Sequence, residues 1–167
     1  MKTRIINTLL CCFMCVFAVQ AQMAAARKIP PAIVMNVMLN QPADSVWKYI
    51  SEPDNFKEYM GFKDVKCYEG RVRDANVYIT FDNGTEREQI ISVLKEDTRQ
   101  INFFVQKSEY LNDKWGYAFQ VYPRGKNKAN VELLLYVMES EKDKFSMTEM
   151  ENEFKTIVAN LKTRYTN

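Results

Sequence analysis

Hydrophobic and polar residues alternate along most of the chain between residues 64 and 138, a pattern typical of β-strands with one buried face. Six segments have this pattern, and short polar turns separate them. They are residues 64–69, 76–82, 87–95, 100–106, 117–123 and 130–138. Because such short turns leave no room for parallel crossovers, the pattern predicts an antiparallel meander.

The alternation also predicts which side chains point into the core. In most strands one set is clearly the more apolar and is therefore expected to face inward. This inward set comprises Val77, Ile79, Phe81, Ile101, Phe103, Val105, Tyr117, Phe119, Val121 and the odd-numbered residues from 131 to 137. The segment around Glu88 is ambiguous, since Gln89, Ile91 and Val93 form an equally apolar alternative. We favour the phase in which Glu88 faces inward.

A further strand is predicted ahead of the meander, over the apolar residues 32–39. Two short helices are expected next, the first beginning at Pro42 and the second spanning residues 55–60. Helices this short are marginal in water, so they must be held by docking apolar side chains onto a larger surface. The side chains expected to dock are Trp47, Ile50, Phe56 and Tyr59.

The chain ends in a long predicted helix over residues 146–165. Apolar residues recur there at steps of three and four and form a broad stripe. The stripe consists of Met147, Met150, Phe154, Ile157, Val158, Leu161 and Tyr165. One face of the helix must therefore be buried, and the apolar face of the sheet is the available partner.

This order of elements resembles the helix-grip fold of the START-like (SRPBCC) superfamily, and within it the bacterial polyketide cyclase/dehydrase and lipid-transport proteins. The resemblance covers residues 33–165 and rests on VMLNQPADSVWKYISEPDNFKEYM (37–60), GTEREQIISVLKEDTRQINFFV (84–105) and AFQVYPRGKNKANVELLLYVM (118–138). It implies an α+β fold in which a curved antiparallel sheet of about seven strands grips the C-terminal helix.

The resemblance also implies a cavity between the sheet and the last helix, of about 300–1,000 Å³, that holds a small hydrophobic molecule or lipid. The same inward side chains are first of all core candidates. Those expected to touch the ligand are Trp47, Tyr59, Ile79, Phe81, Phe103, Tyr117, Phe119, Leu133, Met150, Phe154 and Ile157. A non-catalytic binding or carrier protein is the leading hypothesis.

The N-terminal residues have the three parts of a secretory signal peptide. Lys2 and Arg4 precede an apolar stretch over residues 9–19, which is too short to span a bilayer comfortably. Cleavage is expected after Ala21, with a second possible cut at residues 24–26. Lipid attachment at a cysteine of this region is the less favoured alternative. Residues 1–21 are thus predicted to be a signal peptide, 22–31 a flexible lead-in and 32–167 the folded domain of a periplasmic or secreted protein.

Charge and composition exclude several function classes. Cleavage after Ala21 removes two basic residues and leaves 21 basic and 21 acidic ones, so no net field favours nucleic acid. It also leaves Cys67 as the single cysteine, expected to be a packed small residue. The chain has no histidine, which argues against His-based catalysis and the common zinc sites. No cofactor, metal or further membrane segment is expected, and the sequence does not indicate an oligomeric state.

Two alternatives to a carrier stay open. The first is a cyclase or dehydratase in which an inward Glu88, its pKa raised by desolvation, acts with a hydrogen bond from Tyr117. The second is an envelope interaction module that meets a partner protein through outward aromatic residues such as Phe104, Tyr122 and Tyr136.

Overall fold

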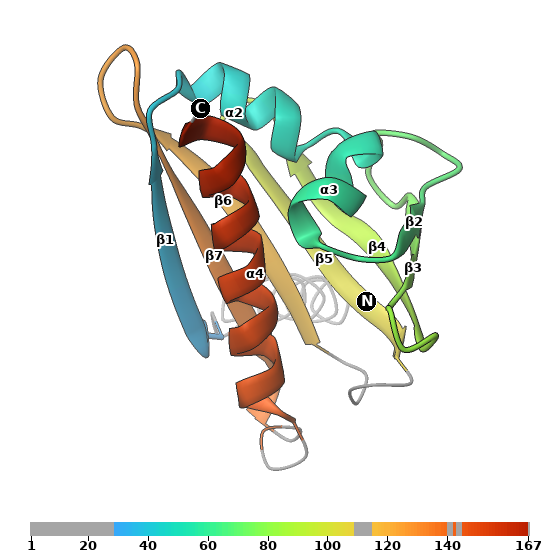
Figure 1. Ribbon diagram of the computed structural model, residues 1–167. Helices are drawn as coiled ribbons and strands as arrows, with labels where there is room; N and C mark the ends of the chain where they lie inside the picture. The colour runs from blue at the N-terminus through green and yellow to red at the C-terminus, as the bar shows by residue number, and fades with distance from the viewer. Residues whose placement is uncertain (1–28, 109–114, 140–141, 143–144, 167) are drawn as a thin grey trace, which may run out of the picture.

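The computed structural model describes residues 29–108, 115–139, 142 and 145–166, so the predicted signal peptide and most of the predicted lead-in lie outside the described residues. The elements follow one another as expected from the sequence (Figure 1). They are β1 (Ile33–Leu39), α2 (Ala43–Ile50), the 3-10 turn η1 (Pro53–Asn55), α3 (Phe56–Met60), β2 (Asp64–Lys66), β3 (Asn76–Thr80), β4 (Glu86–Lys95), β5 (Gln100–Ser108), β6 (Trp115–Pro123), β7 (Ala129–Val137) and α4 (Met147–Thr166). In these ranges no helix has the length and apolarity needed to cross a membrane.

The seven strands form one antiparallel sheet in the order β1-β7-β6-β5-β4-β3-β2. Strands β2 to β7 are sequential neighbours, and β1 returns beside β7, with Ile33 opposite Leu135. The sheet curves around α4, which lies across one face, while α2 and α3 cover the end of that face (Figure 1). The predicted α+β helix-grip architecture is confirmed.

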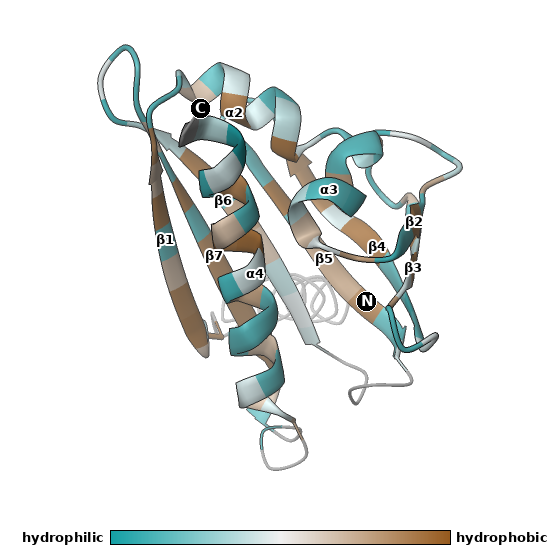
Figure 2. Ribbon diagram, viewed as in Figure 1, coloured by the Kyte–Doolittle hydropathy of each residue, from teal (hydrophilic) through white to brown (hydrophobic). Residues whose placement is uncertain are grey.

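The inner face of the sheet and the apolar stripe of α4 form the core. Met150, Phe154, Ile157 and Leu161 are each 0% exposed, and Met147, Val158 and Tyr165 pack at the edges of the same cluster. Figure 2 shows apolar residues along the strands that α4 crosses, whereas α4 itself alternates between apolar and polar residues. The predicted inward residues that lie in β3, β5, β6 and β7 are buried as expected, whereas Phe81, just after β3, is only partly buried.

In β4 the predicted phase is wrong. Arg87, Gln89 and Ile91 are the buried residues of this strand, whereas Glu88 is half-buried and points to the outer face. Register shifts on either side of Gln89 and Ile91 interrupt the pairing of β4 with β5. Arg87 and Gln89 can face inward because Glu153 and Tyr117 provide polar partners for them in the interior. The local sequence does not reveal these partners.

The two short helices are held by burial, as predicted. Trp47 and Ile50 of α2 and Phe56 and Tyr59 of α3 are all buried. The Tyr59 hydroxyl donates a hydrogen bond to the Ile50 carbonyl at 2.9 Å, which ties the two helices together. Tertiary contacts thus replace the stability that such short helices lack alone.

The end of α3 packs directly on α4. Gly61 has a left-handed backbone conformation, with φ of 74°, and a Cβ atom there would lie 3.0 Å from Thr156 Cγ2. The Asn160 side chain of α4 donates to the carbonyl oxygens of Glu58 and Tyr59 at 3.4 and 3.3 Å. This α3–α4 junction forms one wall of the region described next.

Candidate functional site

Aromatic side chains occupy the space between the sheet and α4. Phe103 and Tyr117 stack with ring centroids 4.9 Å apart, and Tyr59 meets Phe119 edge-on at 5.7 Å. Phe154 of α4 adds an edge contact to Tyr117 at 6.4 Å. Such arrangements are favourable beyond the burial of apolar area, so the interior is a connected aromatic cluster.

The structure places the predicted ligand-lining residues in the interior, although not all in one place. Phe81 is partly buried, and the other ten side chains are buried. The ten are Trp47, Tyr59, Ile79, Phe103, Tyr117, Phe119, Leu133, Met150, Phe154 and Ile157. Trp47 has a different environment, since its indole N–H donates to Glu96, in the turn after β4, at 2.6 Å. Contact of these residues with a ligand stays a prediction.

A cavity of about 220 Å³ opens at the junction of α3, the turn after β3 and α4. We call it the mouth cavity. One wall is apolar and the other is the polar side of α4. Its lining residues are Met60, Gly61, Phe62, Phe81, Glu149, Asn152, Glu153 and Thr156. Of the residues predicted from sequence to line a pocket, Phe81 lies on this cavity.

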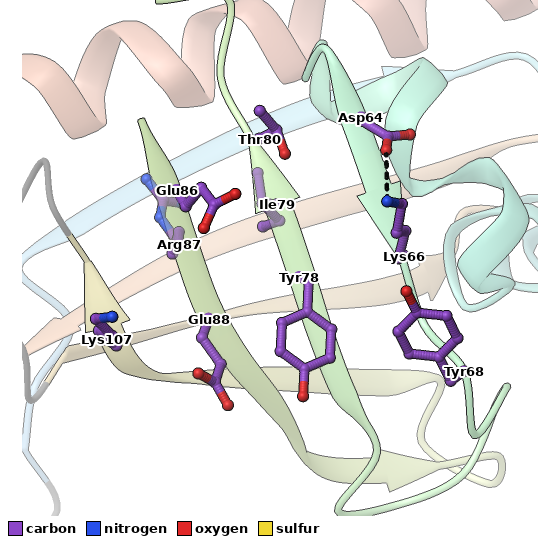
Figure 3. A pocket seen from close by; sticks show the side chains of 10 residues that line it. All are labelled: Asp64, Lys66, Tyr68, Tyr78, Ile79, Thr80, Glu86, Arg87, Glu88 and Lys107. Carbon is purple, nitrogen blue, oxygen red and sulfur yellow. Dashed lines mark ion pairs between the residues drawn. The ribbon is translucent and has the colours of Figure 1, made fainter. Parts of the chain in front are cut away.

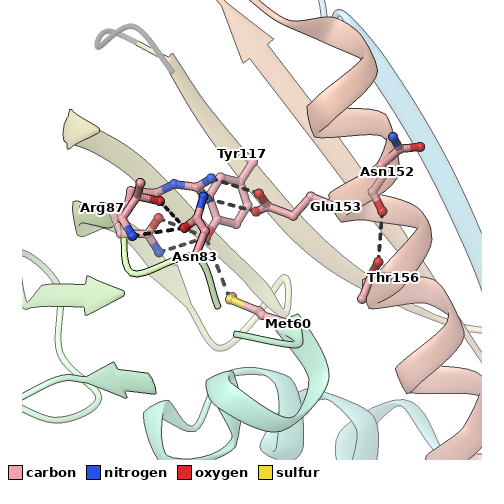
Figure 4. A network of polar contacts seen from close by, with 9 residues as sticks. Met60, Asn83, Arg87, Tyr117, Asn152, Glu153 and Thr156 are labelled. Atoms are coloured by element: carbon pink, nitrogen blue, oxygen red, sulfur yellow. Dashed lines mark hydrogen bonds and ion pairs between the residues drawn. The ribbon is translucent and has the colours of Figure 1, made fainter. Parts of the chain in front are cut away.

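A buried ion pair joins β4 to α4 at the back of the mouth cavity. Arg87 donates two hydrogen bonds to the Glu153 carboxylate, at 2.9 and 2.8 Å, and the two side chains are 0% and 10% exposed (Figure 4). The guanidinium also lies 4.8 Å from the ring centroids of both Phe81 and Trp115. Burial acts to lower the pKa of Arg87, but Glu153 outweighs it and raises that pKa, so Arg87 stays charged.

The Tyr117 hydroxyl is the second polar group of the interior. It accepts a hydrogen bond from Gln89 Nε2 at 2.8 Å, and its own proton can go to Gln89 Oε1 at 3.0 Å or to the Met60 sulfur at 3.8 Å. Figure 4 shows the contact between Tyr117 and Met60. Burial raises the pKa of Tyr117 well above its usual value. The phenol is therefore neutral at physiological pH and can act as a hydrogen-bond donor.

Two buried N–H groups in the same region have no acceptor among the described residues. They are Nε of Arg87 and Nε1 of Trp115, and both side chains are 1% exposed or less. A buried donor without a partner is costly, so a polar ligand atom that accepts from it would gain free energy. The interior thus combines apolar surface with a few donors, which is the composition of small-molecule sites.

Glu88 and Tyr117 are not brought together. Tyr117 faces α4, whereas Glu88 is on the opposite face of the sheet, directly across from Tyr78 and Lys107. The carboxylate that does reach the interior is Glu153, and both of its oxygens bind Arg87. A mechanism that pairs Glu88 with Tyr117 is therefore inconsistent with the geometry.

Sequence reasoning missed Arg87, Gln89 and Glu153. A signal for Glu153 was present, because it lies three residues after Met150 and four before Ile157 and so falls on the apolar face of the helix. The alternative phase of β4 would have placed Gln89 inward, and Arg87 with it. No local pattern indicated that Arg87 and Glu153, 66 residues apart, would meet.

Thiol and metal chemistry would depend on Cys67 and on the grouping of possible metal ligands in the described residues. Cys67 is half-buried, and its thiol donates to the Gly70 carbonyl at 3.3 Å. Burial raises the pKa of this thiol, so the nucleophilic thiolate is scarce at neutral pH. In the part of the chain that the structure describes, no three His, Cys, Asp or Glu side chains gather in a way that could hold a metal ion.

Comparison of the sequence with protein-family models and with curated proteins finds no match. Solved structures do match. The protein XoxI from Bacillus cereus aligns over 81% of this chain and 95% of its own, with a TM-score of 0.66 and 12% identity. A START superfamily protein from Mycobacterium smegmatis aligns over 80% of this chain and 96% of its own, with a TM-score of 0.64 and 13% identity.

The di-domain ARO/CYC protein BexL from the BE-7585A biosynthetic pathway also matches, with a TM-score of 0.65 and 17% identity. The alignment covers 78% of this chain and 45% of BexL. At these identities the similarity is one of fold.

Proposed function

We propose, from the START-like helix-grip fold of this chain, that the protein is an exported, non-catalytic carrier of a small hydrophobic molecule or lipid. The ligand is held between the sheet and α4 and reaches this site through the mouth cavity. The fold by itself hosts many activities, so the proposal depends on the site.

The observation that carries the proposal is the position of the Arg87–Glu153 pair. It lies within an aromatic interior and directly behind a cavity that opens between two helices. Replacing such a buried pair by apolar residues is often neutral or stabilising, so its presence is poorly explained by stability alone. A polar recognition point beside apolar surface is what an amphipathic ligand requires.

The interior donors suggest the chemistry of the ligand. Arg87 Nε, Trp115 Nε1 and the Tyr117 hydroxyl can each donate a hydrogen bond, and the surrounding rings offer apolar contact. The ligand is accordingly an apolar molecule with at least one hydrogen-bond acceptor, such as a carbonyl or carboxylate oxygen.

Uptake of such a ligand requires movement. The mouth cavity, at about 220 Å³, is smaller than the cavity of about 300–1,000 Å³ that the sequence predicted and than the roughly 300 Å³ at which drug-sized sites begin. Because the aromatic cluster fills the space behind it, α3 and α4 must separate or the rings must turn to admit a ligand. The α3–α4 junction at Gly61 and Asn160 is the place where this opening occurs.

A carrier is favoured over an enzyme by the state of the interior carboxylate. Glu88 is on the outer face, and Glu153 is bound by Arg87 through both oxygens, so neither is placed as a general base toward the aromatic interior. This supports binding without turnover.

Identification of a co-purifying molecule tests the proposal. The purified protein is examined by native mass spectrometry and then extracted with organic solvent, and the extract is analysed. We expect a bound species of low polarity that is lost or reduced in Phe154→Trp, which overfills the interior. The matched control is Phe104→Trp, the same change at an exposed position.

A fluorescence titration tests the proposal when no molecule co-purifies with the protein. Trp47 and Trp115 are the two tryptophans of the chain, so Trp47→Phe leaves Trp115 as a reporter of the site. Fatty acids and aromatic polyketides are then titrated in. A fluorescence change that saturates supports the carrier function, whereas an unchanged spectrum with every ligand and no co-purifying species rejects it.

Export is tested separately. We expect N-terminal sequencing of the mature protein from the envelope or medium to begin at Gln22. A protein that retains Met1 and stays with the cytoplasmic fraction would contradict export without affecting ligand binding.

A further inference from the structure

A second, larger hollow lies on the outer face of the sheet, away from α4. It has a volume of about 340 Å³ and spans the ends of β2, β3 and β4 (Figure 3). We call it the outer groove. Its lining residues are Asp64, Lys66, Tyr68, Tyr78, Ile79, Thr80, Glu86, Arg87, Glu88 and Lys107. Since the Arg87 side chain turns inward, the groove is floored by the outward residues of these strands.

Two tyrosines form the aromatic part of the outer groove. Tyr68 is 77% exposed and Tyr78 is 40% exposed, and their ring centroids lie 6.0 Å apart with the planes tilted by 53°. Tyr68 follows β2, and Tyr78 is in the middle of β3, opposite Lys66. Two neighbouring exposed rings on a sheet face present contiguous apolar surface to water, a feature of ligand-binding grooves.

Charged side chains surround the rings in a regular order that the strand register produces. Lys66, Tyr78, Glu88 and Lys107 form one row across β2, β3, β4 and β5. Asp64, Thr80 and Glu86 form the neighbouring row. The groove therefore carries hydrogen-bond donors and acceptors side by side.

Several of these groups are available for a ligand. Lys66 contacts Asp64 at 3.7 Å, which is a loose pair at 57% and 45% side-chain exposure. Within the described part of the chain, Glu86, Glu88 and Lys107 form no ion pair, although Lys107 and Glu88 are opposite each other in register. In Figure 3 Glu88 lies on one side of the Tyr78 ring and Lys66 and Tyr68 lie on the other, while Glu86 is farther along β4 and Lys107 is on the neighbouring strand.

The mixture of signs disfavours a ligand that carries a single sign of charge. Asp64, Glu86 and Glu88 repel an anion, whereas Lys66 and Lys107 repel a cation. A neutral ligand that both donates and accepts hydrogen bonds can pair with carboxylates and ammonium groups together. If it also has flat apolar faces, it can pack on the tyrosine rings.

We propose that the outer groove binds a neutral saccharide. A pyranose ring presents C–H groups on its faces, which suit Tyr68 and Tyr78. Its hydroxyls lie around the edge, donate to Glu88 and Glu86, and accept from Lys107 and Lys66. The volume of about 340 Å³ is at the lower end of the range for small-molecule sites and suits a short oligosaccharide.

The side chains proposed to bind the saccharide are not those proposed to bind the carrier ligand, although Ile79 and Arg87 border the outer groove from the inner face. The outer groove lies on the face of the sheet opposite the aromatic cluster, and Glu88 contributes to the groove and not to the interior. Occupancy of one site can therefore be lost without loss of the other.

Saturation-transfer difference NMR with the whole protein tests the proposal, since it detects weak binding. The probes are the N-acetylglucosamine tetramer, maltotetraose and xylotetraose as neutral saccharides, trigalacturonate as an anion and spermidine as a cation. We expect transfer to at least one neutral tetramer and to neither charged probe. Absence of transfer to all three neutral probes, or stronger transfer to a charged one, would overturn the proposal.

Substitutions then locate the site. Tyr68→Ala removes a highly exposed ring and leaves the core intact, and we expect it to weaken binding of the positive tetramer at least tenfold. Tyr68→Phe keeps the ring face and should bind within about threefold of the unchanged protein. Phe104→Ala, an aromatic truncation elsewhere on the outer face, should have no effect. Equal binding by Tyr68→Ala and the unchanged protein would show that the saccharide lies elsewhere.

Discussion

Arg87 and Glu153 show at the scale of single residues how a charge is kept inside an apolar core. The guanidinium is fully buried, and the carboxylate that neutralises it comes from the helix that the sheet grips. Removal of one partner of such a pair leaves a buried charge without compensation, whereas removal of both leaves none. A variant that loses one partner should therefore be much less stable than a variant that loses both.

We expect Arg87→Met to lower the free energy of unfolding by about 3 kcal/mol, because Glu153 then loses its partner. The double variant Arg87→Met/Glu153→Leu should return to within about 1 kcal/mol of the unchanged protein. Urea denaturation measures both. Lys155→Met is the control, since it breaks the exposed pair with Glu151 at 2.8 Å and should cost less than about 0.5 kcal/mol. A double variant as unstable as Arg87→Met would contradict this account.

Glu96 makes stability depend on pH. Partial burial opposes ionisation, but hydrogen bonds from Trp47 and Arg71 and the charge of Arg71 outweigh it and lower the pKa of Glu96. Because the pKa is lower in the folded state, Glu96 contributes fully above about pH 4.3, the unfolded value, and its contribution is lost as the pH falls through the folded pKa.

We expect Glu96→Gln to destabilise the protein by less than about 1 kcal/mol at pH 7, as is usual for exposed pairs. The difference from the unchanged protein should shrink as the pH falls below about 4.3 and vanish below the pKa of the folded state. Denaturation curves over pH 3–7 measure it. A difference that stays constant down to pH 3 would show that the charge of Glu96 is not the cause.

At the scale of elements, contact with α4 stabilises the C-terminal end of α3. Gly61 ends α3 in a left-handed conformation and lies against Thr156, while Asn160 caps the last carbonyl groups of α3. Gly70 has nearly the same φ, 73°, but no atom lies within 4 Å of a Cβ built there. Substitutions at these two glycines can therefore distinguish the cost of backbone strain from the cost of disturbed packing between α3 and α4.

We expect Gly70→Ala to cost about 1 kcal/mol, the strain of a left-handed alanine. Gly61→Ala should cost more, about 2 kcal/mol, because its Cβ would also push Thr156 and Asn160 away. Thermal or urea unfolding compares them directly. Equal decreases in the free energy of unfolding would mean that Thr156 and Asn160 can move away from an added Cβ at little cost.

For the whole molecule, the packing of α4 on the sheet stabilises the fold and, in the proposed carrier, also limits the access of a ligand to the interior. Aromatic rings pack in the interior, and the α3–α4 junction borders the mouth cavity, which is the proposed way in for a ligand. Loosening this junction should change how fast a ligand is exchanged more than how tightly the core is packed.

Asn160→Ala removes the hydrogen bonds from α4 to the end of α3. We expect several-fold faster association of an apolar ligand, followed by stopped-flow fluorescence of Trp115 in the Trp47→Phe background. Thr163→Ala is the control, since its hydroxyl bonds within α4, to the Ala159 carbonyl at 3.0 Å. Unchanged association in Asn160→Ala would place the way in elsewhere.

Much of the fold was predictable because its signals are local. The alternation of Ile101, Phe103 and Val105, or of Tyr117, Phe119 and Val121, assigns one face of a strand without reference to any other part of the chain. The apolar stripe of α4 is equally self-contained. In β4 the same reasoning failed, because both phases of the strand are similarly apolar and the buried residues Arg87 and Gln89 are polar.

The amino-acid sequence by itself determined the order of the elements, the inner face of most strands and the identity of the aromatic cluster, since period and hydrophobicity act over a few residues. Only the tertiary structure decided that Glu88 faces away from Tyr117, that Glu153 neutralises Arg87 and that Tyr68, Tyr78 and Glu88 share a groove. The physical reason is that the neutralisation of a buried charge and the shape of a groove depend on residues from different elements. These residues are far apart along the chain, and no local sequence pattern indicates that they will meet.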